Sequence, residues 1–294
     1  MAKFWRVGRI DRVTAAPLRR RLLHNGRFEV IPLKSLMPQL QHLPLGASVS
    51  VTASPNKSLE DTWELTRVLR DQGFRPVPHL AARMVKDHRH LERLIKELRE
   101  LELNELFIVG GDAPEPFGPY EDSIQVLQAI LDLDHRLNHI GVTAYPDGHS
   151  FIERTVLGQS LRRKQDLLQQ AGIDGHAATQ MCFDPDTIRD WLRDERTTGL
   201  KLPIHLGIPG AVERSKLLSM GAKLGVGASL RYLQKNAGTL TRMVLPGGYN
   251  PNKLLSPLAP DLAELDIQAL HIFTFNQIAS TVSWRDEAVS ALKI

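Results

Sequence analysis

The chain has 294 residues, of which 42% are hydrophobic and 24% charged, and these proportions exclude a disordered, collagen-like or coiled-coil protein. The formal net charge is +4 at pH 7, and no apolar run approaches the roughly 20 residues that a membrane-spanning helix needs. Cys182 is the only cysteine, which excludes an intrachain disulfide and a zinc finger and fits a reducing, cytoplasmic compartment.

The positive charge is concentrated at the N-terminus. Residues 1–26 hold seven Lys and Arg residues against Asp11 alone, a net +6, so the other 268 residues carry −2. We expect a basic, solvated and partly ordered extension over 1–26, followed by one catalytic domain over 27–294. An organellar transit peptide and a contact with a subunit or nucleic acid are the alternatives. Nucleic acid is the least favoured, because the segment has few aromatic residues and no recognised binding module.

From residue 27 onward, short β-rich runs alternate with longer segments of helical periodicity. The predicted strands are 27–33, 48–53, 75–82, 105–110, 139–145, 176–183, 203–208 and 270–275. The predicted helices are 58–72 with Ser58 as N-cap, 87–103, 122–133, 152–170, 185–197, 212–224 and 277–292. A further helix is expected over 229–236, and a long Gly- and Pro-punctuated loop over 236–265.

This alternation predicts an α/β protein with a parallel sheet, and its count and length fit a closed (β/α)8 TIM barrel as a single domain. The strands are near-continuous apolar runs, as a sheet covered on both faces requires. In such a barrel the chemistry lies at the C-terminal ends of the strands. The polar residues within or just after the predicted strands are Glu29, Thr52, His79, Asp112, Tyr145, His149, Gln180, Thr274 and Asn276.

Glu29 is the strongest catalytic candidate, because it lies in the apolar run Phe28-Glu29-Val30-Ile31. Desolvation disfavours a charged carboxylate, and a carboxyl group kept protonated can act as a general acid near neutral pH. The alternative is a solvated glutamate at a strand edge, paired with Arg27 or Lys34.

Asp112 follows Gly110-Gly111, where glycines allow a flat ligand to approach the backbone closely. A plain turn before two prolines is the alternative for this aspartate. His79 and Gln180 are individually weaker, since a lone polar residue in an apolar strand is often a satisfied core group.

Simpler catalytic and binding templates are missing from the sequence. There is no GxGxxG after a strand, no phosphate-binding P-loop, no HExxH and no GxSxG. The eleven histidines show no metal-ligand spacing, so the sequence predicts no metal site. Cys182 has no evident activating base and is interpreted as a packing residue.

Eight segments in order resemble the methylenetetrahydrofolate reductase family, the folate enzymes with a (β/α)8 barrel. They are FEVIP (28–32), VSVTA (49–53), PHL (78–80), GGDAPEP (110–116), AYPDGH (144–149), TQMCFD (179–184), PIHLGI (203–208) and HIFTFN (271–276). Each fragment alone is weak. Eight in the family's order, each at a predicted strand end, make a fairly specific resemblance.

The resemblance implies an oxidoreductase that interconverts 5,10-methylenetetrahydrofolate and 5-methyltetrahydrofolate with NAD(P)H. Glu29 would be the general acid that protonates the imidazolidine ring, and Asp112 would hydrogen-bond the pterin beside the flavin. Gln180, with Phe273 and Asn276, would bind substrate. The positions that would line the cofactor site are Thr52, His79, Gly111, Tyr145 and His149.

The resemblance leaves FAD use open. Flavin-using members carry an Asp and a Lys on the helix after the fifth strand, whereas this chain reads LGQSLRRKQDLLQQAG at 157–172, with Lys164 out of register. An arginine common before the GD pair is replaced by Gly110. Some short family members are thought to pass hydride directly from NAD(P)H to the folate, and the sequence is compatible with both modes.

Two other functions compete with the reductase. One is a non-catalytic, folate-binding accessory subunit, suggested by the altered flavin positions and the basic N-terminal segment. The other is the same barrel running oxidatively in methyl-group catabolism, since one active site serves both directions of a reversible hydride transfer. The preferred nicotinamide and the oligomeric state are not encoded in these patterns, although barrels of this type commonly form homo-oligomers.

Overall fold

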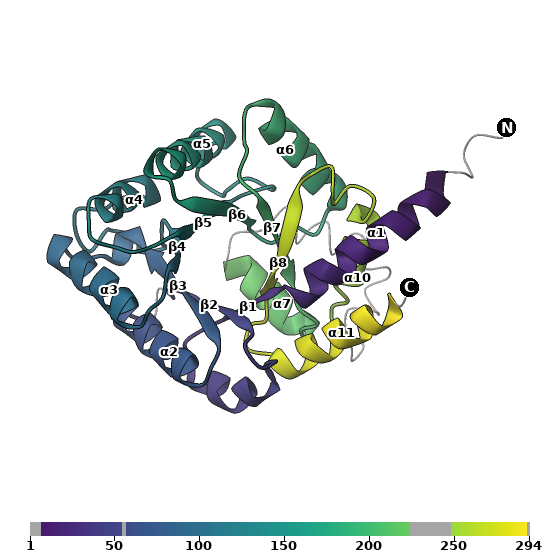
Figure 1. The fold of residues 1–294 in the computed structure, drawn as a ribbon, viewed down its shortest axis with the longest axis horizontal. Coiled ribbons are helices and arrows are strands. Elements are labelled where there is room, and N and C mark those ends of the chain that lie inside the picture. The colour runs from purple at the N-terminus through teal and green to yellow at the C-terminus, as the bar shows by residue number, and fades with distance from the viewer. Residues whose placement is uncertain (1–6, 55–56, 224–247, 293–294) are drawn as a thin grey trace.

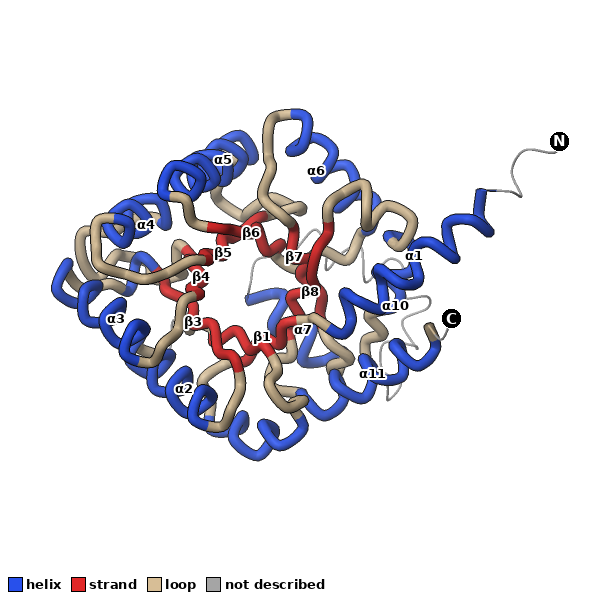
Figure 2. Tube along the Cα trace, viewed as in Figure 1, coloured by secondary structure: helices blue, strands red, loops and turns tan. Residues whose placement is uncertain are grey.

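The computed structural model describes residues 7–54, 57–223 and 248–292, with side chains described from Ala15 in the first helix and up to Ser219 in α7. Eight parallel strands form a closed barrel in the order β1-β2-β3-β4-β5-β6-β7-β8, and helices surround it (Figures 1 and 2). This confirms the predicted (β/α)8 TIM barrel.

The element bounds agree closely with the sequence pattern. The strands are β1 Arg27–Val30, β2 Ser48–Val51, β3 Arg75–Ala81, β4 Glu105–Val109, β5 His139–Ala144, β6 Asp174–Thr179, β7 Ile204–Pro209 and β8 Ile267–Phe273. The helices are α1 Val7–His24, η1 Lys34–His42, α2 Leu59–Asp71, η2 Ala82–Met84, α3 His88–Glu100, α4 Ser123–Leu131, α5 Arg154–Ala171, α6 Pro185–Thr197, α7 Arg214–Lys223, α10 Asn252–Leu258 and α11 Ile278–Ala291.

Helix α2 shows how local sequence fixes a boundary. The Ser58 hydroxyl accepts from the Asp61 amide at 3.1 Å, and the Asp61 carboxylate accepts from the Ser58 amide at 2.9 Å. This reciprocal capping box satisfies two donors that the first helical turn cannot pair internally. The predicted N-cap at Ser58 is therefore confirmed.

Three segments differ from the sequence prediction. The end of α1 is not a solvated extension, because Leu22 and Leu23 are fully buried where the helix packs on β8 and α11. The 3₁₀ helix η1 was not predicted. Within the expected loop 236–265 the chain forms α10, whereas residues 236–247 and the expected helix 229–236 lie outside the described residues.

Side-chain alternation in β1 explains why the barrel has a polar interior. Phe28 and Val30 point outward and are fully buried against the helices, whereas Arg27 and Glu29 point into the barrel. Neighbouring strands follow the same two-residue period. The lumen therefore holds polar side chains together with a small apolar cluster of Val77, Phe107 and Ala178, and the main apolar core lies between sheet and helices.

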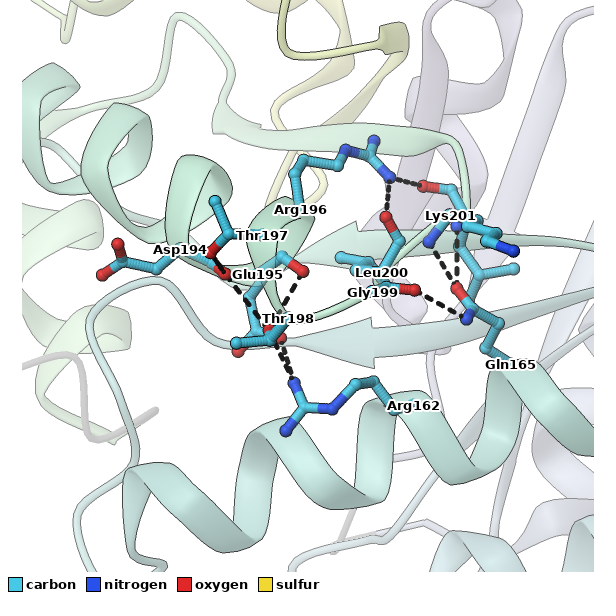
Figure 3. Close-up of polar contacts among 11 residues, drawn as sticks. Arg162, Gln165, Asp194, Glu195, Arg196, Thr197, Thr198, Gly199, Leu200 and Lys201 are labelled. Atoms are coloured by element: carbon cyan, nitrogen blue, oxygen red, sulfur yellow. Dashed lines mark hydrogen bonds and ion pairs between the residues drawn. The ribbon is translucent and has the colours of Figure 1, made fainter.

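A polar network fastens α5 to the connection between α6 and β7 (Figure 3). Gln165 of α5 donates to the Gly199 carbonyl at 3.1 Å and accepts from the Leu202 amide at 3.1 Å. Arg162 pairs with Glu195 of α6 at 2.7 Å. The two bonds from Gln165 pair a backbone carbonyl and a backbone amide of this connection, which lies outside the β-sheet and so has no neighbouring strand to bond them.

Candidate active site

Glu29 and His271 meet inside the barrel where its first and last strands join. The Glu29 Oε2 atom lies 2.7 Å from Nε2 of His271, and the side chains are 14% and 2% exposed respectively. Residues 27–29 of β1 pair with 271–273 of β8, so closure of the barrel itself brings the two groups together. At this distance the carboxyl group and the ring are hydrogen-bonded.

His79 of β3 lies beside this pair. Its ring centroid is 6.1 Å from that of His271 and 4.6 Å from that of Phe107. Burial, and then the nearby His271 and Arg27, lower the pKa of His79 well below its usual value of 6.5. The ring is therefore neutral at pH 7, and its buried Nε2 has no hydrogen-bond partner among the described residues. It can serve a ligand as donor or acceptor.

Tyr145, His149 and Asp112 lie in the loops that follow β5 and β4. The Tyr145 and His149 rings meet edge to face with centroids 5.4 Å apart. Burial raises the pKa of Tyr145 and lowers that of His149, while the charge of Asp112 raises both. Asp112 is exposed, and its charge acts on both rings. The roles of these three residues in binding stay predictions.

Gly111 and Thr52 line the same end of the barrel. Gly111 has φ +94°, and a Cβ there would lie 3.0 Å from the Ala81 Cβ, so a side chain would be both strained and crowded. The Thr52 hydroxyl oxygen is buried without a partner among the described residues. A ligand could lie close against the Gly111 backbone and hydrogen-bond the Thr52 hydroxyl. The roles of both residues in cofactor binding stay predictions.

Two of the predicted substrate residues, Gln180 and Phe273, have defined contacts within the protein. The Gln180 Oε1 atom accepts from the Met181 amide at 2.8 Å, which orients this half-buried side chain at the end of β6. The Phe273 ring lies 5.2 Å from His271, centroid to centroid, and borders a small apolar cluster. Substrate binding by these two residues stays a prediction.

Asn276 has a structural task that the sequence did not suggest. Its amide accepts from the Ile31 backbone N–H and donates to the Ile31 carbonyl, both at 2.9 Å. The Thr274 hydroxyl donates to the Glu29 carbonyl at 2.6 Å. These bonds continue the β8–β1 seam beyond the strands and hold Glu29 in place. The predicted contact of Asn276 with substrate stays a prediction.

Sequence reasoning missed His271 as a partner of Glu29. The residue stands in the quoted segment HIFTFN, and its two-residue offset from Phe273 places both on one strand face. Because closure of the barrel was predicted, β8 could have been placed beside β1. The sequence did not give the register between these two strands, and the register decides which residue of β8 lies next to Glu29.

A group of three histidines at the opposite, N-terminal end of the barrel was also missed, of which His176 is buried and the other two are half-buried. His139, His176 and His205 come from the starts of β5, β6 and β7, and burial lowers the pKa of each. His139 Nε2 lies 2.7 Å from His176 Nδ1. Arg27 pairs with Glu105 of β4 at 2.6 Å in the same layer. We call this end of the lumen the barrel floor.

Helix α5 bears on the fit of FAD. Its Arg162 is engaged by Glu195, and its Lys164 is buried, with Nζ 3.4 Å from the Ser123 hydroxyl of α4. Both cations therefore lie within the helical layer. Gly111, Thr52 and His149 could surround a flavin ring, but α5 provides no residue in the position of the family's Asp–Lys pair. The residues present fit the ring side of FAD and not its remaining part.

The family model described as methylenetetrahydrofolate reductase matches residues 31–225. The chain belongs to this family. The match covers strands β2 to β7, and therefore includes Asp112, Tyr145, His149 and Gln180. It does not include Glu29 or His271, so assigning roles to this pair rests on the geometry described above and on the segment resemblance.

A solved structure extends the likeness of this methylenetetrahydrofolate reductase family member to nearly the whole chain. The uncharacterized protein from Clostridium thermocellum, described as binding two copies of 5-methyl-5,6,7,8-tetrahydrofolic acid, superposes with a TM-score of 0.62. The superposition covers 93% of this chain and 99% of that chain at 14% identity, which shows a common fold. Among the described helices, none is long and apolar enough to cross a membrane.

Proposed function

We propose that this chain reduces 5,10-methylenetetrahydrofolate to 5-methyltetrahydrofolate with hydride from NAD(P)H, and that Glu29 is the general acid. The observation that carries the proposal is the Glu29–His271 pair inside the barrel, 2.7 Å apart, below a mouth bordered by Asp112, Tyr145 and His149. Family membership supports the folate chemistry, and the pair supplies the one proton that this chemistry needs.

The chain's own residues would act as follows. Glu29 gives its proton to a nitrogen of the imidazolidine ring, the ring opens by breaking the bond from that nitrogen to the bridging carbon, and an iminium ion results. The hydride then adds to that carbon and gives the methyl group. One proton and one hydride enter, so the reaction balances with oxidation of NAD(P)H. His271 orients the Glu29 carboxyl group, and neutral His79 adds a dipole without a competing positive charge.

Direct transfer from the nicotinamide fits this chain better than FAD mediation, because Arg162 and Lys164 of α5 are engaged by neighbouring helices. The visible spectrum of the purified protein tests this part separately. A colourless and active protein supports direct transfer. Flavin absorption that stays with the protein through purification contradicts it without affecting the proton-donor role.

The activity test is anaerobic oxidation of NADH or NADPH in the presence of 5,10-methylenetetrahydrofolate, with 5-methyltetrahydrofolate identified by mass. Glu29→Gln is the test variant, and Glu92→Gln, which alters an exposed glutamate of α3, is the matched control. We expect turnover in the wild type and control and its loss in Glu29→Gln.

A non-catalytic folate-binding subunit is the second candidate, because α5 lacks the family's flavin-binding pair. It predicts that the wild type binds 5-methyltetrahydrofolate but forms no product with either nicotinamide, even with added FAD. The same assay therefore separates the two functions. Reaction in the oxidative direction is measured on the same protein with NAD(P)⁺ and 5-methyltetrahydrofolate.

A further inference from the structure

Three potential metal ligands converge at the barrel floor, far along the strands from the mouth. Glu105 begins β4, His139 begins β5, and His176 is the third residue of β6. One carboxylate oxygen and one nitrogen from each ring all lie within 4.8 Å of one another. We call these residues the floor triad. The missing metal motif in the sequence does not bear on this cluster, because its ligands come from three different strands.

The spacing of the floor triad is close to that of a metal's coordination shell. His139 Nε2 lies 2.7 Å from His176 Nδ1 and 3.9 Å from Glu105 Oε1. In a tetrahedral site with metal–nitrogen bonds of ~2.0–2.1 Å, ligand atoms are about 3.3 Å apart. Both of these separations therefore differ from the ideal by about 0.6 Å, and the third, between Glu105 and His176, is at most 4.8 Å. Side-chain rotations can close these differences.

The surrounding residues hold His176 in the orientation that ligation needs. The His176 ring stacks on that of His205, with ring centroids 3.6 Å apart. It also stacks on the His139 ring, with ring centroids 5.0 Å apart. A Cβ on Gly141 would lie 2.5 Å from His176 Cε1, so only glycine leaves room for this ring. The His176 ring is fully buried, and its Nε2 has no partner among the described residues.

We propose that Glu105, His139 and His176 bind one divalent transition-metal ion of the zinc type. Two imidazoles and one carboxylate are a ligand set that suits Zn²⁺ and Co²⁺. His139 and Glu105 are 31% and 24% exposed, so the ion enters from the floor, and a water molecule completes its coordination. Such an ion ties β4, β5 and β6 together at the end of the barrel away from folate.

Arg27 limits the affinity of this site. Its Nη2 donates to Glu105 Oε1 at 2.6 Å, which orients the carboxylate but places a positive charge next to the ion. We therefore expect binding in the micromolar range. A second His and Glu group of similar spacing, Glu29 with His79 and His271, belongs to the candidate active site and is not part of this proposal.

Cobalt titration of the full chain without an affinity tag tests the site, because bound Co²⁺ absorbs visible light in a way that reports its coordination. We expect one equivalent of Co²⁺ to bind and Zn²⁺ to displace it. His139→Gln and Glu105→Gln should each weaken binding at least roughly tenfold, since even outer-shell partners contribute about 10–100-fold in metal affinity. Thermal melts check that both variants fold, and His139 is exposed enough to tolerate the change.

Two control variants locate the ion. His88→Gln removes an exposed histidine that lies 3.5 Å from Glu92 on the same helix, the arrangement of an adventitious surface site. Glu29→Gln removes the carboxylate of the candidate active site. Both should bind Co²⁺ as the wild type does. The proposal is overturned if the wild type takes up no Co²⁺ or Zn²⁺ at millimolar concentration, if His139→Gln binds normally, or if either control loses the ion.

Discussion

The Glu29 carboxyl group and the His271 ring are hydrogen-bonded at 2.7 Å across the seam where β8 closes onto β1. The His271 side chain is almost fully buried, and the Glu29 side chain is 14% exposed. A carboxyl group held in this way keeps a fixed orientation within the lumen. The hydrogen bond therefore fixes the position of the Glu29 carboxyl group relative to the His271 ring.

His271 should act as a positioning residue for Glu29. His271→Leu removes the hydrogen bond, so we expect kcat to fall by roughly 10- to 100-fold, less than the about 10²–10⁴-fold contribution of a general acid itself. The pH dependence of kcat should shift as well, while KM for folate changes little. His271→Gln keeps a polar group near the Nε2 position and should recover part of the rate. Unchanged pH profiles in both variants would show that His271 only fills space.

Asn276→Ala tests whether this residue holds the seam or contacts substrate. The change leaves the Ile31 N–H and carbonyl without the two 2.9 Å partners they now have. We expect a loss of about 2 kcal/mol in the free energy of unfolding, because partly buried backbone groups are left unpaired. Urea denaturation measures it. A variant of wild-type stability with a raised KM for folate would instead assign Asn276 to substrate binding.

Much of this architecture follows from the sequence pattern. The eight strands follow from apolar runs of the right length, and α2 follows from its Ser58 cap, because both signals are local. Glu29 was found because a carboxylate within an apolar run is unusual. His271 was missed because the register between the first and last strands is a long-range property that no local pattern carries.

The barrel floor shows the same limit. His139, His176 and His205 stand near the starts of separate strands, and each alone resembles an ordinary boundary residue. Their contact depends on which strands are neighbours and how those strands are staggered. Similarly, α1 was interpreted as an extension because its arginines dominate its composition. Its buried Leu22 and Leu23 dock on β8 and α11, elements at the other end of the chain.

Gly141 should be intolerant of a side chain. A Cβ at this position would lie 2.3 Å from Phe107 Cδ2 and 2.5 Å from His176 Cε1. Overpacking of this kind costs about 1–3 kcal/mol, so Gly141→Ala should lower the midpoint of urea unfolding. Gly110→Ala is the matched control, since a Cβ there meets nothing within 4 Å. Equal stabilities for the two variants would mean that the lumen is more adaptable than its packing indicates.

The buried Lys164 should make stability depend on pH in the alkaline range. Burial lowers its pKa from 10.5 to about 8, so between these values the unfolded chain binds more protons than the folded one. Stability from this group therefore rises with pH from about 8 and levels off above the unfolded pKa. Lys164→Met should remove that rise and raise the free energy of unfolding at pH 7 by about 3 kcal/mol. Urea denaturation at pH 7, 8 and 9.5 measures both effects, and a variant with the wild-type pH dependence would contradict the assignment.

The most direct test of the whole account is the steady-state rate of methyltetrahydrofolate formation by Glu29→Gln under saturating NADH and folate. Gln keeps the shape of the side chain but has no proton to give, so kcat should fall by about 10²–10⁴-fold while folate still binds. A Glu29→Gln enzyme that turns over at the wild-type rate would show that the proton comes from another group, and the role assigned to the Glu29–His271 pair would be wrong.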